Sequence, residues 1–132
     1  MIYNRRMAQT ILVVDDDPDI LKILKQELEA NNYRVVTANN GSTAIRLALT
    51  QKPDLIVLDV AMPMTTGLKA FDSIRSNPQT QSIPVIFLTG LPSANVYPSV
   101  AKGTRVAHLK KPVDLVDLLS LIQQFLQEYP SK

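Results

Sequence analysis

LIVLD, at residues 55–59, is the stretch that decides how this chain folds. Leu55–Leu58 is apolar on both faces, and such a run is typical of a strand that helices cover on both sides, as in a parallel sheet. Pro53 and Asp54 lie just before this run and mark a break between secondary-structure elements. The run ends on the carboxylate of Asp59, so a charged side chain stands where a buried strand comes to its end.

Three further apolar runs each end on a reactive side chain: Ile11–Val14 before Asp15, Asp16 and Asp17, Val85–Leu88 before Thr89, and Val106–Leu109 before Lys110 and Lys111. The carboxyl ends of parallel strands lie along one edge of a sheet, where ligands bind. The sequence therefore predicts one crevice in which carboxylates, a hydroxyl and an ammonium group meet.

The remaining pattern is an alternation of strands and helices. The predicted strands are Thr10–Val14, Tyr33–Thr37, Leu55–Leu58, Ile83–Leu88 and Val106–Leu109. Apolar residues at helical spacing predict four helices. The first follows the cap Asp17 and the first residue Pro18 and ends at Asn31-Asn32, with Ile20, Ile23, Leu24 and Leu28 at this spacing. The second runs from the turn Asn39–Ser42 to about Thr50, with Ile45, Ala48 and Leu49 inward. The third spans Gly67–Ser76 (Leu68, Phe71, Ile74), and the last spans Asp114–Glu128 with Leu115, Leu118, Leu119, Ile122, Phe125 and Leu126 on one face. Right-handed crossovers then give an α/β fold with a doubly wound five-stranded parallel sheet.

The fourth helix of this (βα)5 pattern is predicted to be short or irregular. Pro92 and Pro98 stand between Gly90 and Gly103. A proline inside a helix costs about 3 kcal/mol, so an unbroken helix is not expected there.

Bulk properties indicate one ordinary globular domain. The chain has 132 residues, no cysteine and a net charge of +2, and no apolar run approaches the ~20 residues that cross a bilayer. We expect a flexible extension at residues 1–8, the domain at 9–129 and a tail at 130–132. A cytoplasmic protein is expected, with no membrane partner and no nucleic acid partner for this domain alone.

The charges are unevenly distributed along the chain. Four of the 12 acidic residues fall within Asp15–Asp19, and none lies between Ser73 and Val113. That second stretch, called here the basic flank, carries five cations: Arg75, Lys102, Arg105, Lys110 and Lys111.

Taken in order, the motifs ILVVDDDPDI, LIVLDVAMPMTTGL, VIFLTG and HLKKP resemble the receiver domain of two-component response regulators over almost the whole chain. The resemblance implies a flavodoxin-like strand order 2-1-3-4-5. It also implies a phosphoacceptor switch in phosphorelay signal transduction. Such a protein is not an enzyme acting on a metabolite, although it promotes its own phosphorylation and dephosphorylation.

The resemblance assigns Asp59 as the phosphorylated aspartate, and a carboxylate is a competent nucleophile for forming an aspartyl-phosphate. Asp15 and Asp16 match the acidic pair that holds Mg²⁺, a cation that prefers carboxylate and carbonyl oxygens. Asp16, Asp59 and the backbone carbonyl of Ala61 are expected to bind the metal directly, and Asp15 mainly through water. Asp17 is better explained as a helix cap.

Lys111 matches the lysine that contacts phosphoryl oxygens, and the bond before Pro112 is usually cis in relatives. Thr89 matches the switch hydroxyl. His108 stands where relatives commonly carry Tyr or Phe, and we interpret it as a switch or packing residue. Ala61 and Leu91 occupy the positions that tune phosphoryl lifetime, and neither can orient an attacking water, so slow self-dephosphorylation is predicted.

The expected partners are a histidine kinase or histidine phosphotransfer protein as donor, and a downstream protein that reads the face made by the fourth helix region, the fifth strand and the last helix. Because this face is basic at Lys102 and Arg105, an acidic or anionic partner is predicted. One alternative is a degenerate receiver that acts as a phosphorylation-independent docking module. Another is a phosphatase of the haloacid-dehalogenase type with Asp15 and Asp17 in its site, which leaves Asp59 unexplained.

Overall fold

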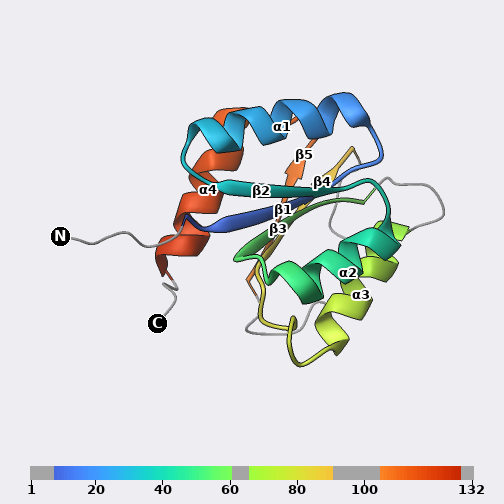
Figure 1. The fold of residues 1–132 in the computed structure, drawn as a ribbon. Helices are drawn as coiled ribbons and strands as arrows, with labels where there is room; N and C mark the ends of the chain where they lie inside the picture. Colours follow the sequence, from blue (N-terminus) through green and yellow to red (C-terminus); the bar gives the residue numbers. More distant parts are fainter. Residues whose placement is uncertain (1–7, 61–65, 91–104, 129–132) are drawn as a thin grey trace.

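The computed structural model of the protein describes residues 8–60, 66–90 and 105–128, with the side chains of 66–68 and 127–128 left aside. Five parallel strands form one sheet in the order β2-β1-β3-β4-β5 (Figure 1). Their bounds are β1 Thr10–Val14, β2 Arg34–Ala38, β3 Leu55–Asp59, β4 Val85–Thr89 and β5 Val106–Lys110. The predicted fold class and strand order are confirmed.

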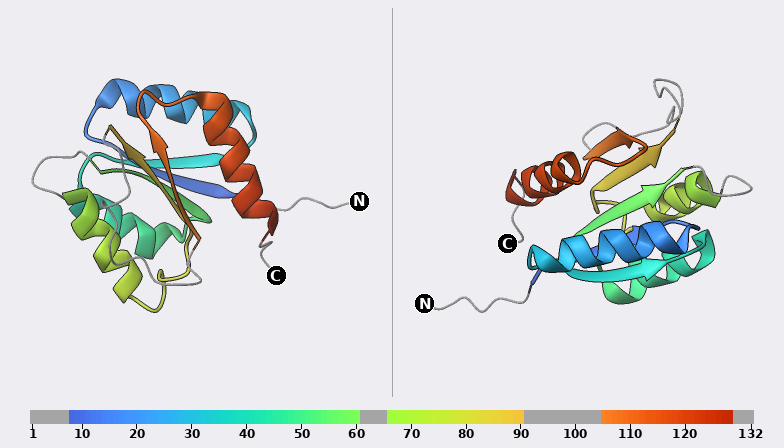
Figure 2. Two further views of the ribbon diagram at one scale, coloured as in Figure 1. Left: turned by 180° about the vertical axis from the view of Figure 1, so that it is seen from behind. Right: turned by 90° about the horizontal axis from the view of Figure 1, so that it is seen from above.

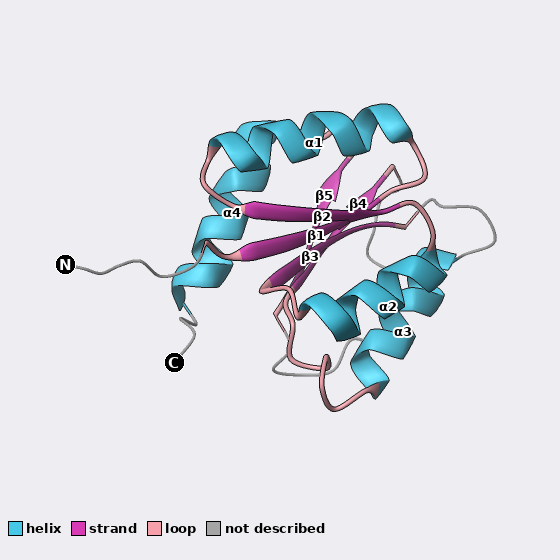
Figure 3. Ribbon diagram, viewed as in Figure 1, coloured by secondary structure: helices cyan, strands magenta, loops and turns pink. Residues whose placement is uncertain are grey.

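Helices cover both faces of the sheet, as Figures 2 and 3 show. Their bounds are α1 Pro18–Ala30, α2 Gly41–Gln51, α3 Thr66–Ser76 and α4 Leu115–Glu128. Here α4 is the last helix of the chain, and the predicted irregular helix lies in residues 91–104, outside the described residues. Within the described residues no helix is long and apolar enough to cross a membrane.

Alternation of side chains along the strands builds two apolar layers. Ile11 and Val13 of β1 pack on one side with Leu24 of α1 and Leu118 of α4. Leu12 of β1 and its neighbours pack on the other side with α2 and α3. Successive strand residues point to opposite faces of the sheet, so a strand with no exposed residue is covered on both faces. β1, β3 and β4 are buried throughout and therefore form the centre of the molecule.

The start of α1 is as predicted. The Asp17 side chain accepts a hydrogen bond from the backbone N–H of Asp19 at 2.9 Å, and Pro18 is the first helical residue. A proline has no N–H to leave unsatisfied at that position. Ile23 shares the helical spacing of the buried Leu24 and Leu28, but its own side chain is 50% exposed.

The second strand begins one residue later than predicted. The backbone N–H of Tyr33 donates to the carbonyl of Leu28 at 3.2 Å and so belongs to the closing turn of α1. Pairing starts at Arg34, whose N–H donates to the carbonyl of Gln9 at 2.9 Å. The closing bonds of the helix therefore set the strand boundary.

Small side chains bring α2 close to the sheet. Asn40 caps the helix by accepting from Thr43 N–H at 2.8 Å. Ala44 and Ala48 are fully buried. Ile45 and Leu49, which were predicted to point inward, are only half-buried. A helix that packs through alanines approaches the strands closely, and this leaves its larger apolar residues at the margin of the contact.

The later elements follow the prediction with shifts of one or two residues. β4 starts at Val85 rather than Ile83, and α4 starts at Leu115 because Asp114 caps it, accepting from the N–H groups of Val116 and Asp117. Arg105 donates from Nη1 to the carbonyl of Phe125 at 2.8 Å. This bond ties the segment that enters β5 to the last turns of α4.

Candidate functional site

Parallel pairing of the strands brings three charged side chains to one edge of the sheet. Asp15 follows β1, Asp59 is the last residue of β3, and Lys111 follows β5. The Nζ of Lys111 lies 3.2 Å from Oδ1 of Asp59 and 3.5 Å from Oδ2 of Asp15. The crevice expected at the strand ends is therefore present in the structure.

Asp15 is the most deeply placed of these groups, with no exposed surface. Its Oδ1 accepts a hydrogen bond from the N–H of Asp17 at 2.9 Å, whereas its Oδ2 has no hydrogen-bond partner. Burial raises the pKa of Asp15 to about 6, and the nearby charge of Asp59 adds to this, although the Asp17 N–H and Lys111 oppose it. The carboxyl of Asp15 thus titrates close to neutral pH.

Lys111 neutralises part of this negative charge. Burial alone would lower the pKa of Lys111, but its hydrogen bond and ion pair with Asp59 and the charge of Asp15 outweigh burial and raise it. The peptide bond between Lys111 and Pro112 is cis. The backbone N–H of Lys111 donates to the carbonyl of Thr89 at 2.8 Å, which fixes the chain where the side chain turns into the crevice.

The carboxylates fit a divalent cation. Asp15, Asp16 and Asp59 each offer an oxygen, and these oxygens lie within 4.8 Å of one another. Asp16 is exposed while the other two are buried, so the group opens to solvent on one side. The Oδ2 of Asp15 accepts no hydrogen bond and lies 3.5 Å from the Lys111 Nζ, so it can serve as a ligand atom. This donor set suits Mg²⁺, which binds one or two carboxylates and keeps several waters. Ala61, the expected carbonyl ligand, lies outside the described residues.

Thr89 and His108 lie on the two strands nearest Lys111. Thr89 ends β4 with 2% of its surface exposed. His108 is exposed on β5 and is paired in register with Phe87 of β4. Leu91, the expected lifetime-tuning residue, lies outside the described residues.

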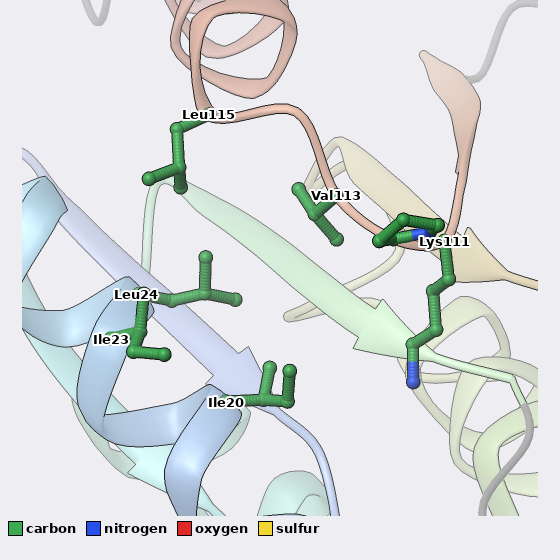
Figure 4. Close-up of a pocket in the computed structure, with 7 residues that line it drawn as sticks. Ile20, Ile23, Leu24, Lys111, Val113 and Leu115 are labelled. Carbon is green, nitrogen blue, oxygen red and sulfur yellow. The ribbon is translucent and has the colours of Figure 1, made fainter.

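An apolar groove borders the crevice, and the sequence interpretation missed it. It encloses about 200 Å³ and is lined by residues from α1 and from the segment that joins β5 to α4: Ile20, Ile23, Leu24, Lys111, Pro112, Val113 and Leu115. Figure 4 shows the side chains of α1 facing those of Val113 and Leu115, with the Lys111 side chain running along one end. The helical spacing of Ile20, Ile23 and Leu24 was the only sign of this groove in the sequence, and spacing does not show which of these side chains is exposed.

The basic flank is only partly available to a partner. Lys102 lies outside the described residues. Arg105 is bonded to the carbonyl of Phe125, and Lys111 is paired with the two buried aspartates. Lys110 is exposed on β5. Arg105 thus connects β5 with α4, a structural role that the charge pattern did not indicate.

Residues 11–123 match the family model described as response regulator receiver domain. The chain is 37% identical over 123 residues to a probable cyclic di-GMP phosphodiesterase of Vibrio cholerae; the match covers 93% of this chain and 28% of that protein. The chain belongs to the response regulator receiver domains of two-component signalling. Such domains are generally switches rather than enzymes, and this chain spans less than a third of the length of that relative.

Solved structures agree with this assignment. The chemotaxis protein CheY4 of Vibrio cholerae superposes with a TM-score of 0.81 at 30% identity, over 90% of this chain and 99% of that one. The receiver domain of a sensor histidine kinase from Pseudomonas aeruginosa, with a magnesium ion coordinated in its active site cleft, gives a TM-score of 0.79 at 27% identity, covering 91% of this chain and 98% of that one.

Proposed function

We propose that this receiver domain accepts a phosphoryl group on Asp59 from a histidine kinase or a histidine phosphotransfer protein, in the cytoplasm and with Mg²⁺. The observation that carries the proposal is the position of Asp59. Its carboxylate is 1% exposed and lies 3.2 Å from the Lys111 ammonium, within a group of three carboxylates. A nucleophile, a cation and a metal-binding group at one point are what phosphoryl transfer requires.

The transfer forms a bond between a carboxylate oxygen of Asp59 and phosphorus. The bond between phosphorus and the donor imidazole nitrogen breaks, and the imidazole leaves with that electron pair. Lys111 offsets charge on the phosphoryl oxygens, because its Nζ already lies beside the accepting oxygen. Bound Mg²⁺ would neutralise further negative charge between the aspartates and the phosphoryl group.

The product carries a new dianionic group at the end of β3, and this is a local charge event that can bias a two-state element. We assign Thr89 the role of a hydroxyl donor to a phosphoryl oxygen. It ends the neighbouring strand β4, and its carbonyl holds the backbone of Lys111. His108, exposed on β5, would change position with it and alter the face that a downstream partner reads.

The donor's docking site, in this proposal, is the apolar groove beside Lys111. A donor that delivers a phosphoryl group to Asp59 must contact the rim of the crevice, and Lys111 belongs both to the crevice and to the groove wall. The exposed Ile23 lies on that wall. Burying an apolar side chain there contributes roughly 25 cal/mol per Å², so an apolar residue of the donor would hold the complex in register.

The test is labelling with acetyl phosphate and Mg²⁺, read by intact mass. The wild-type protein should gain the mass of one phosphoryl group, and Asp59→Asn should gain none. Asp72→Asn removes an exposed carboxylate of α3 and should label like the wild type. An unlabelled wild type would leave the docking module as the function, and labelling that survives Asp59→Asn would show that another residue is the acceptor.

A further inference from the structure

Carboxylates border the α1 wall of the apolar groove beside the phosphorylation site. Ile20 and the exposed Ile23 belong to that wall. Asp19 stands directly before Ile20 and is exposed. Glu27 is half-buried and follows Ile23 by four residues and Ile20 by seven. Residues at this spacing share one stripe of a helix, so Glu27 lies one turn beyond the groove on the same stripe.

The opposite wall carries a carboxylate as well. Asp114 is exposed and lies between the lining residues Val113 and Leu115. Its Oδ1 accepts hydrogen bonds from the N–H groups of Val116 at 2.9 Å and Asp117 at 3.1 Å. These bonds hold the carboxylate at the start of α4. Asp19, Glu27 and Asp114 are called here the acidic rim of the groove.

The acidic rim is not neutralised by cations of its own chain. The ion pairs within the described residues are those of Lys25 with Glu29 and of Lys111 with Asp15 and Asp59. The remaining cation of α1, Lys22, is exposed and forms none of these pairs. The sequence of α4 contains no Lys or Arg. The groove therefore has an excess of negative charge on both sides.

A bound metal ion would leave this charge in place. The carboxylates that can hold Mg²⁺ are those of Asp15, Asp16 and Asp59, and the acidic rim contributes none of them. The charge of the rim thus acts on whatever docks in the groove, both before and after the metal binds.

We propose that the acidic rim selects a phosphoryl donor whose contact surface has an apolar side chain flanked by Lys or Arg. The apolar side chain covers Ile23, while the flanking cations meet the rim carboxylates. Opposite charges speed the encounter and fix its register, and like charges reject other donors. This inference rests on the proposed function and deepens it by naming the chemistry of the donor surface.

The order of residues along α1 predicts how the donor lies. Lys111 lines one end of the groove, as Figure 4 shows, and also contacts Asp59. Ile20 and Glu27 are about 10 Å apart along the helix axis, since each residue adds about 1.5 Å. A donor helix aligned with α1 therefore carries its phosphohistidine near Lys111 and a cation about two turns from the residue that meets Ile20.

The probe is a capped helical peptide with Leu at every third or fourth position and Lys at the flanking positions. The control ligand has Glu in place of Lys. Each is titrated into the unphosphorylated full chain with Mg²⁺ while the Ile23 methyl signal is followed by NMR. The Lys peptide should shift this signal and bind about tenfold more tightly than the Glu peptide. Equal affinities, or an Ile23 signal that does not move at millimolar Lys peptide, would overturn the proposal.

The double variant Glu27→Gln, Asp114→Asn removes two rim charges while the shapes of the side chains are nearly kept, and Asn still caps α4. It should bind the Lys peptide about fivefold more weakly than the wild type. Asp72→Asn removes an exposed carboxylate from α3, on the other face of the sheet, and should change binding by less than about twofold. A double variant that binds like the wild type would also overturn the proposal.

Labelling of wild-type Asp59 by acetyl phosphate needs no docking partner, so it tests the proposed function separately. A protein that is labelled but does not distinguish the two peptides would lose this inference alone.

Discussion

Lys111 and Asp59, which are far apart in the sequence, form an ion pair of 3.2 Å between Nζ and Oδ1 across the edge of the sheet. The carboxylate is buried, and the ammonium side chain is 27% exposed. The pair is therefore shielded from solvent on the side of Asp59 and open on the side from which a phosphoryl donor would come. This asymmetry leads to the first prediction.

Lys111→Met removes the cation while it leaves an apolar stem in place. Labelling by acetyl phosphate should fall roughly 100-fold, which is the size of effect seen when one group that stabilises developing charge is lost. The free energy of unfolding of the metal-free protein should fall by about 1–3 kcal/mol, since a buried carboxylate loses its partner. Urea unfolding and intact-mass labelling measure the two effects. Lys110→Met, which removes the neighbouring exposed cation, should change neither, and equal losses in both variants would contradict the role of Lys111.

A second prediction concerns pH. The pKa of Asp15 is raised from its ordinary value to about 6, so its proton is held more tightly in the folded chain than in the unfolded one. The stability of the metal-free protein should therefore fall as the pH rises from about 4 to about 6. Mg²⁺ requires the ionised carboxylate, so the rise in melting temperature that Mg²⁺ causes should be small near pH 5 and larger near pH 7.5.

Asp15→Asn separates these two effects. Without the buried charge, the metal-free variant should melt above the wild type at neutral pH, and the Mg²⁺-induced rise should shrink because a ligand is missing. Melting curves with Mg²⁺ and with EDTA at several pH values measure both effects. A variant that keeps the full Mg²⁺ response would show that Asp15 takes no part in binding the metal.

A third prediction depends on sequence alone. Neither Ala61 nor Leu91 can orient a hydrolytic water, so the phosphorylated protein should lose its phosphoryl group slowly. Ala61→Asn supplies a side chain that can hydrogen-bond to such a water, and it should shorten the lifetime. Phosphoryl content followed over time in Mg²⁺ gives both rates, and a wild-type half-life of seconds would refute the assignment.

The strand ends were predictable because two strong constraints act there together. A fully buried parallel strand must be apolar on both faces, and the first residue beyond it is free to be polar, so LIVLD marks both the strand and the position of Asp59. Asp17 and Pro18 likewise mark the start of α1, since Asp17 accepts a hydrogen bond from an open N–H group of the helix end and Pro18 has no N–H that needs an acceptor.

Other features depended on contacts that no local pattern encodes. Ile23 fits the apolar stripe of α1, but its exposure depends on how the helix packs on β1 and β2. The Tyr33 boundary depends on a closing bond to Leu28. Arg75 and Arg105 look alike in the sequence as cations of the basic flank. Only the fold separates a guanidinium without acceptors from one that caps α4.

The apolar groove gives the fourth prediction. Ile23→Lys places a charge on its wall at a position that is already half exposed, so the fold should be kept. Phosphotransfer from the cognate histidine donor should fall at least tenfold, because a charge replaces an apolar contact at the interface centre. Labelling by acetyl phosphate, which needs no docking, should stay within twofold of the wild type.

Val116→Lys is the matched control for that variant. Val116 is an apolar side chain, 75% exposed on α4, and it does not line the groove. The Val116→Lys variant should accept the phosphoryl group from the same donor at the wild-type rate. If both variants lose transfer equally, the effect comes from general charge repulsion. If neither does, the donor docks elsewhere.

The last prediction follows from the bond between Arg105 and Phe125. Arg105→Gln removes a charged donor from the carboxyl end of α4, where a cation also favours the helix dipole, and the free energy of unfolding should fall by about 1–2 kcal/mol. Hydrogen exchange should quicken in the last turns of α4 first. Lys110→Gln makes the same charge change on the exposed side of β5 and should leave both quantities unchanged.

The charge reversal Arg105→Glu would therefore weaken partner binding in two ways, through the lost bond to Phe125 and through the reversed charge. Only a comparison with Arg105→Gln isolates the effect of the charge. If exchange at α4 is the same in wild type and Arg105→Gln, the bond to Phe125 has no stabilising role.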